Sequence, residues 1–158
     1  MEIFTYTFTV DASLNAVTAF HADTRVLKRL NPPLIFVQLH RVDPMAEGSI
    51  SEFTLWIGPM PIRWRAVHSN VGPQGFTDTQ EMGPLASWKH THHFESIDED
   101  TTQIHEQIVY EYPSGWRGLL ARTLFGRLGL SALFAYRKWV TRWGSSRIEQ
   151  MSQIKMEK

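Results

Sequence analysis

The stretch SWKHTHHFE carries three of the chain's seven histidines. An imidazole can ligate a metal, move a proton near neutral pH or hydrogen-bond a carboxylate, so the direction of each ring decides its chemistry. In an extended strand successive side chains point to opposite faces. This alternation places four residues on one face: Trp88, His90, His92 and Phe94. The apolar members predict that this face is buried, whereas His93 falls on the opposite face and is predicted to meet solvent.

Carboxylates recur on the corresponding faces of the neighbouring segments. Asp78 shares a face with Phe76 and Gln80 in one segment, and Glu106 shares a face with Tyr110 in another. Buried carboxylates and imidazoles need partners. We therefore expect these groups either to pair with the two histidines or to face a ligand.

The inner wall predicted by this alternation is aromatic but too polar for a dry core. We predict it as the ligand-binding surface: Trp64, Phe76, Asp78, Gln80, Trp88, His90, His92, Phe94, Glu106, Ile108 and Tyr110. The alternative is that the same residues only stabilise the wall by pairing with one another.

General acid–base chemistry is a second possibility for this wall. A histidine oriented by a carboxylate could move a proton, and Tyr110 could donate to a developing enolate oxygen. The catalytic candidates are His90, His92, Asp78, Glu106 and Tyr110. No G-x-S-x-G motif is present, which argues against a covalent nucleophile.

Metal binding is a third possibility. His90 and His92, two positions apart on a strand, could ligate an ion together with Asp78 or Glu106. The sequence contains no cysteine, which excludes thiolate ligands and disulfides. Pairing with the acids accounts for the histidines without an ion, so the sequence predicts no metal and no cofactor.

The overall composition is that of an ordinary globular protein. The 158 residues are 42% hydrophobic, and 16 basic residues balance 16 acidic ones. We expect a single domain over residues 1–158, no nucleic-acid partner, and a monomer or homodimer. The start of the chain lacks the pattern of a signal peptide, and no uninterrupted apolar run reaches about 18 residues. These features predict a cytoplasmic protein.

Periodicity and turn residues predict a curved antiparallel sheet of about seven strands around one long helix, an α+β architecture. The expected strands cover 2–10, 34–41, 48–57, 62–69, 75–82, 85–97 and 101–112. Two short helices, about 14–22 and 24–30, follow the first strand. A long helix over about 128–148 closes the chain, with Leu133, Tyr136, Val140 and Trp143 at helical spacing. Because one helix does not fill a concave sheet, a cavity is expected between them.

The segment 114–130 is apolar and basic, and no acidic residue occurs from Ser114 to Ile148. We expect a short helix or an ordered loop at the mouth of the cavity. Contact with anionic lipid is one hypothesis for this segment, with Trp116 and Phe125 entering the interface. The alternatives are a lid over the cavity and an arginine-rich surface without a further role.

The order of these elements resembles the START-like superfamily, also called SRPBCC, which includes polyketide cyclase/dehydrase-like and Bet v 1-type helix-grip proteins. The matching stretches are 10–33, 63–64, 76–94 and 106–113. The resemblance implies a deep, mostly apolar cavity whose wall includes Asp78, Gln80, Trp88, His90, His92, Phe94, Glu106 and Tyr110. Many members of the superfamily bind or transfer small hydrophobic molecules, and some are cyclases.

Together, these observations predict binding, and with it transport or sequestration, of a small hydrophobic molecule such as a lipid or polyketide. The first alternative is a cyclase or dehydratase that uses a histidine–carboxylate pair. The second is a membrane- or protein-docking module built on the segment 114–130.

Overall fold

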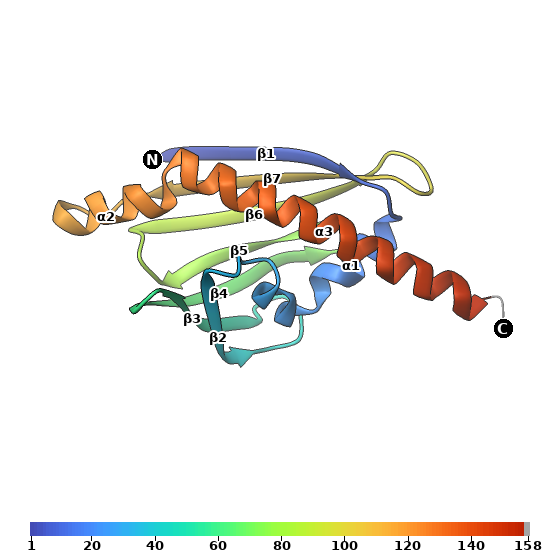
Figure 1. Ribbon diagram of the computed structural model, residues 1–158, viewed down its shortest axis with the longest axis horizontal. Coiled ribbons are helices and arrows are strands. Elements are labelled where there is room, and N and C mark those ends of the chain that lie inside the picture. Colours follow the sequence, from blue (N-terminus) through green and yellow to red (C-terminus); the bar gives the residue numbers. More distant parts are fainter. Residues whose placement is uncertain (157–158) are drawn as a thin grey trace.

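The computed structural model describes residues 1–156 (Figure 1). Seven strands form one antiparallel sheet: β1 (Glu2–Val10), β2 (Ile35–Val42), β3 (Ile50–Ile57), β4 (Met60–Gly72), β5 (Gly75–Met82), β6 (Ser87–Ser96) and β7 (Thr102–Glu111). The helices are α1 (Leu14–Ala22), the 3-10 helix η1 (Thr24–Lys28), α2 (Gly115–Phe125) and α3 (Arg127–Met156). The α+β class and the seven strands predicted from the sequence are confirmed.

The strand order is β1-β7-β6-β5-β4-β3-β2, so the last strand of the chain lies beside the first. After the crossover from β1 to β2, each strand pairs with the next one along the chain, and β7 closes the sheet against β1. Figure 1 shows α3 lying across one face of this sheet, with α1 beside it near the start of β5. Helix α3 therefore lies on the sheet face that was predicted to line a cavity.

Several predicted boundaries differ from the structure by one or more residues. Strand β4 begins at Met60 rather than at residue 62, because the tight turn at Gly58-Pro59 brings Met60 directly opposite Ile57. The second short helix is a single 3-10 segment rather than a helix to Leu30. Helix α3 continues eight residues past Ile148 to Met156, because no proline or glycine interrupts it there.

The buried side of α3 is rotated from the one predicted. Leu130, Phe134, Thr141 and Ser145 are almost fully buried, in addition to Val140. Trp143 is instead half exposed, with the guanidinium groups of Arg29 and Arg147 near its ring at 5.2 and 4.9 Å. The sequence did not predict this buried stripe, because Thr141 and Ser145 are polar. Apolar periodicity alone placed Trp143 on the buried side instead.

Helix α3 approaches α1 closely through a glycine. A Cβ at Gly144 would overlap the buried ring of Phe20. At the start of α1, Ser13 Oγ caps the backbone N–H of Ala16 and donates to Glu149 Oε2 of α3. These contacts fix the end of α3 on α1, and α1 carries one further cavity residue, described below.

The helical stretch Gly115–Ile154 is long and apolar enough, by length and composition alone, to cross a membrane. Arginines at positions 117, 122 and 127 interrupt this stretch, so it contains no uninterrupted apolar run of about 18 residues, in agreement with the sequence. The apolar window includes the boundary between α2 and α3, where Gly126 adopts an extended conformation with ψ 167°. The two helices are thus separate elements, and α3 packs against the sheet through a buried stripe.

Candidate functional site

A cavity of about 140 Å³ lies between the sheet, the α1–η1 region and α3. Most of its lining is apolar: Val26, Leu27, Leu30, Met45, Phe53, Leu55, Trp64, Ala66, Phe76, Trp88, Phe125 and Leu133. The remainder is polar: His21, Thr24, Asn31, Ser51, His68, Asp78, His90, His92 and Arg137. The pocket therefore combines a mainly apolar lining with a smaller number of polar side chains, as ligand sites commonly do.

Strand register brings the central polar groups together. Asp78 of β5 lies directly opposite His90, and Glu106 of β7 lies directly opposite His92. Register near His92 depends on Gly75, whose φ of 128° and close approach to the His92 carbonyl exclude a side chain. The four side chains thus form a cluster across three strands, which we call the histidine–carboxylate cluster.

Each imidazole of the cluster lies between the two carboxylates. Glu106 Oε2 is 2.8 Å from both His90 Nε2 and His92 Nδ1. Asp78 Oδ2 is 3.5 Å from His90 Nδ1 and 3.3 Å from His92 Nε2. The contact between His92 Nδ1 and Glu106 is close but not aligned as a hydrogen bond. The best-formed hydrogen bond of the cluster is therefore the one between His90 and Glu106.

Burial and charge act in opposite directions on these groups. Burial alone would lower the pKa of His92, but the negative charges of Glu106 and Asp78 outweigh it and raise that pKa to about 9. Burial would likewise raise the pKa of each carboxyl. The two histidines nevertheless hold the pKa values of Asp78 and Glu106 well below the usual range. At neutral pH the cluster therefore holds two carboxylates and a cationic His92.

Two further basic side chains border the cluster. His21 of α1 lies with its ring centroid 6.0 Å from that of His92, and its Nδ1 donates to the Val17 carbonyl over 2.9 Å. Burial and the positive charge of His92 lower the pKa of His21 to about 4, so His21 is neutral. Arg137 of α3 donates from Nε to the Leu30 carbonyl and also lines the cavity.

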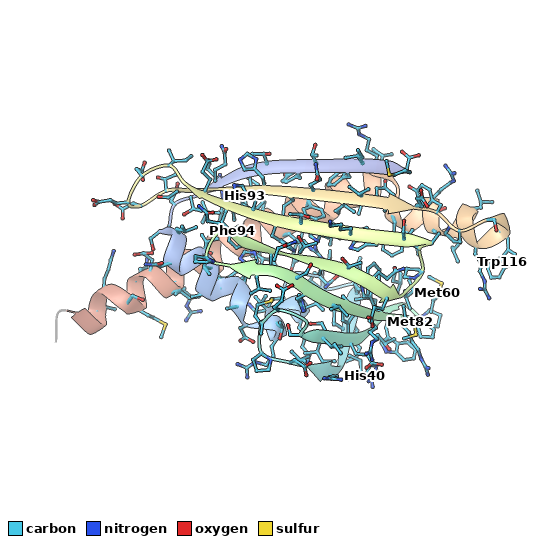
Figure 2. All side chains as sticks on the ribbon, turned by 180° about the vertical axis from the view of Figure 1, so that it is seen from behind. His40, Met60, Met82, His93, Phe94 and Trp116 are labelled. Carbon is cyan, nitrogen blue, oxygen red and sulfur yellow. The ribbon has the colours of Figure 1, made fainter. Side chains whose placement is uncertain are left out.

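The structure places the eleven predicted wall residues in three settings. Six line the cavity: Trp64, Phe76, Asp78, Trp88, His90 and His92. Glu106 lies behind the two histidines, buried and in contact with both. His93 is exposed on the opposite face of β6, as predicted, and Figure 2 shows it on the side of the sheet away from α3.

The other four wall residues point inward but do not line the cavity. Phe94 packs with α1, and Ile108 packs under Phe134 of α3. Tyr110 receives a hydrogen bond from Tyr112 over 3.4 Å, and burial raises its pKa, which makes it a poor proton donor. Gln80 Nε2 donates to the Leu85 carbonyl. Strand alternation predicted the correct face, but it could not show which part of that face α3 and α1 cover.

Several lining residues were missed by the sequence analysis. Phe53 and Leu55 come from β3, whose faces were not assigned, and Arg137 comes from a helix interpreted only by its apolar periodicity. His68 lies four positions after Trp64 in β4, so strand alternation places it on the same face, but it was not among the predicted wall residues. His21 has the clearest sequence signature, since it follows Val17 and Phe20 on the inner side of the first helix.

The sequence matches no protein-family profile and no curated protein. Solved structures do match. The START superfamily protein from Mycobacterium smegmatis is 15% identical with a TM-score of 0.65, covering 94% of this chain and 98% of that one. The Zhui aromatase/cyclase from Streptomyces sp. R1128 is 18% identical, with a TM-score of 0.63 and 94% of each chain covered.

A third neighbour is the norcoclaurine synthase from Thalictrum flavum, solved in complex with dopamine and hydroxybenzaldehyde. It is 15% identical with a TM-score of 0.66, and the match covers 90% of this chain and 85% of that chain. Identities this low establish architecture rather than activity. The chain has the helix-grip fold of START-like proteins, which confirms the predicted fold.

Proposed function

We propose that this protein binds a small, mainly apolar molecule in the cavity between the sheet and α3, with the polar end of that molecule on the histidine–carboxylate cluster. The observation that carries the proposal is the composition of the pocket. Aromatic and aliphatic side chains form its body, and Asp78, His90 and His92 lie together on one part of its wall. The START-like and aromatase/cyclase neighbours support the same class of function.

The volume of the cavity sets the size of the ligand. A cavity of about 150 Å³ in another protein holds benzene, and the cavity here measures about 140 Å³. One aromatic ring therefore fits, and a lipid or a multi-ring polyketide would require Phe125 or Leu133 to move. The norcoclaurine synthase neighbour, solved with single-ring compounds, supports a ligand of this size.

The charges of the cluster set the polarity of the ligand. Cationic His92 supplies an N–H donor and Asp78 an acceptor, so a hydroxyl or carbonyl group would be recognised there. Removing such a group would leave buried polar atoms of the protein without partners. We therefore expect a phenol-like compound to bind more tightly than a hydrocarbon of the same shape.

The experiment compares p-cresol with toluene by calorimetric titration and by the fluorescence of Trp64 and Trp88. Both should saturate, with p-cresol the tighter ligand. Ala66→Leu fills the cavity and should abolish binding of both compounds, whereas Ala19→Leu on the exposed side of α1 should not change it. Saturable binding that survives Ala66→Leu, or the lack of any saturable binding, would refute the cavity as the site.

Proton transfer to or from a bound carbonyl compound is a second candidate function. The observation that favours it is that His92 and Asp78 both border the cavity while contacting each other at 3.3 Å. If the pair is catalytic, the protein should accelerate exchange of the methyl hydrogens of acetophenone for deuterium. His92→Gln should abolish the acceleration and His93→Gln should preserve it. Exchange at the buffer rate would exclude this chemistry for simple aryl ketones.

Peripheral membrane contact is a third candidate, favoured by the surface of α2. Trp116 is 73% exposed, Leu119 is 72% exposed, and Leu128 at the start of α3 is 89% exposed. Figure 2 shows Trp116, at the start of α2, beyond the edge of the sheet. Because arginines flank these residues, vesicles rich in phosphatidylserine should bind the protein and phosphatidylcholine vesicles should not. Binding that is unaffected by Trp116→Ala with Leu119→Ala would contradict this candidate.

A further inference from the structure

The geometry points to a binding site for one divalent transition-metal ion, held by Asp78 Oδ2, His90 Nδ1 and His92 Nε2 at the cavity end of the histidine–carboxylate cluster. Ligand atoms from these three residues lie within 4.8 Å of one another. The inference goes beyond the proposed function and does not depend on it, because metal binding can be measured without any organic ligand.

The first argument is the spacing of the donor atoms. Asp78 Oδ2 lies 3.5 Å from His90 Nδ1 and 3.3 Å from His92 Nε2. Charge-assisted hydrogen bonds are shorter, about 2.7–2.9 Å. Two ligands on a tetrahedral zinc ion, each about 2.0–2.2 Å from it, are separated by about 3.3–3.5 Å. The observed distances therefore suit an ion between the side chains better than direct hydrogen bonds.

The second argument is the position of Glu106 on the far side of both rings. Its Oε2 lies 2.8 Å from His90 Nε2 and from His92 Nδ1, the two nitrogens that face away from Asp78. Metal-binding histidines commonly donate the N–H of the second nitrogen to a carboxylate, which fixes the tautomer and the ring orientation. Here one buried carboxylate is placed to do this for both rings.

The third argument is a buried polar atom that the cluster leaves unsatisfied. His92 is 8% exposed, and its Nδ1 has no aligned hydrogen-bond partner despite the nearby carboxylate. A small rotation of the ring toward an ion at Nε2 would let Nδ1 donate to Glu106. With both imidazoles neutral, a divalent ion also matches the two negative charges of the buried carboxylates.

The ligand set indicates which ions would bind. Two imidazoles and one carboxylate on one side of an ion suit Zn²⁺, Fe²⁺ and Co²⁺, whereas Mg²⁺ and Ca²⁺ prefer oxygen ligands. Since Asp78, His90 and His92 all line the cavity, the remaining coordination positions would face it. An oxygen atom of a cavity ligand could occupy one of them.

The test begins with protein stripped by a chelator and titrated with Zn²⁺ by calorimetry. We expect one ion per chain. Asp78→Asn and His92→Ala should each weaken binding more than 100-fold. Glu106→Gln should keep the stoichiometry and weaken binding about 10- to 100-fold, as the loss of an outer-shell carboxylate does elsewhere. His93→Ala is the matched control on the exposed face of the same strand and should not change the affinity.

A second measurement on the unmodified chain guards against variants that fail to fold. Nitrogen-15 spectra of the imidazoles should show Zn²⁺ shifting His90 Nδ1 and His92 Nε2, while the nitrogens beside Glu106 keep their protons. The inference is overturned if no stoichiometric binding occurs, or if His93→Ala abolishes it, which would place the ion on the surface. Mg²⁺ binding as tightly as Zn²⁺ would also contradict the assigned ligands.

Discussion

Glu106 Oε2 lies 2.8 Å from His90 Nε2, and the side chains of both residues are at least 94% buried. The pair joins β7 to β6 at the wall of the cavity, where both side chains have little contact with solvent. A buried charge that loses its partner costs far more than an exposed one. The fold therefore depends on the same contact that orients the candidate site.

Replacing Glu106 tests that dependence. Glu106→Ala leaves two buried imidazoles without their shared carboxylate, so the free energy of unfolding should fall by about 3–5 kcal/mol. Glu95→Ala removes a carboxylate that is 62% exposed and should change it by less than about 1 kcal/mol. Urea denaturation measures both. Equal effects of the two substitutions would show that the buried pair has no special role in stability.

The dependence of stability on pH follows from two histidines of opposite behaviour. The pKa of His92 is raised from 6.5 to about 9. The resulting contribution of His92 to the free energy of unfolding is therefore full below pH 6.5 and is lost as the pH rises through 9. The pKa of His21 is lowered from 6.5 to about 4, so its contribution is full above pH 6.5 and is lost as the pH falls through 4. Titration of each histidine should change the free energy of unfolding by up to about 3 kcal/mol.

Metal-free protein should therefore be most stable near pH 6.5, which urea denaturation between pH 4 and pH 9 can establish. His21→Gln should flatten the acid side of the profile and leave the alkaline side unchanged. His93→Gln, on the exposed face, should alter neither. Stability that rises steadily from pH 6.5 to pH 9 would contradict the raised pKa of His92.

Gly144 provides a packing test away from the site. Alanine favours a helix over glycine by about 1 kcal/mol, but a Cβ at 144 would overlap the ring of Phe20. We expect Gly144→Ala to lower the free energy of unfolding by about 1–3 kcal/mol, as overpacked substitutions do. Ser131→Ala, at an exposed position of α3, should be neutral or slightly stabilising. A stabilised Gly144→Ala variant would show that α1 and α3 separate at little cost.

Phe125 at the end of α2 should limit the size of the ligand. Its ring centroid lies 6.0 Å from that of Trp64 and 6.2 Å from that of Trp88. Phe125→Ala would enlarge the cavity toward α2, so 1-naphthol should bind at least tenfold more tightly while p-cresol binds no better. Fluorescence titration measures the affinity for both ligands, and Phe36→Ala, at an exposed position of β2, is the control. No gain for 1-naphthol would place the size limit elsewhere.

The fold was predictable because local signals agreed along most of the chain. Alternation in β1 and β6, turn residues such as Gly58-Pro59 and Gly72-Pro73, and a long helical period at the end all pointed to a helix packed on a curved sheet. The buried stripe of α3 was less predictable. Its position depends on Gly144, Thr141 and Ser145, whose small side chains permit close packing but carry no apolar periodicity.

The site was predictable only for residues that share one sheet face. Alternation correctly brought together Asp78, His90, His92 and Glu106, because sheet geometry fixes which side chains of neighbouring strands meet. His21 and Arg137 reach the cavity from helices, and their approach depends on how those helices cross the sheet. Helical spacing could have placed His21 on the inner side of α1, but no pattern within a single segment encodes how α1 and α3 cross the sheet, so the position of both residues beside the cluster required the three-dimensional structure.

The length of α3 has a consequence for how the molecule fluctuates. In its first half, Leu130, Phe134 and Val140 are buried against the rest of the protein. Its contact with α1 ends near Glu149, and beyond that residue Met151 and Ile154 are more than half exposed. Backbone amides in the buried first half of α3 should exchange with deuterium only through global unfolding, whereas those after residue 150 should exchange by fraying of the helix end. A single helix would thus record a gradient of protection from the most stable part of the chain to one of the least stable.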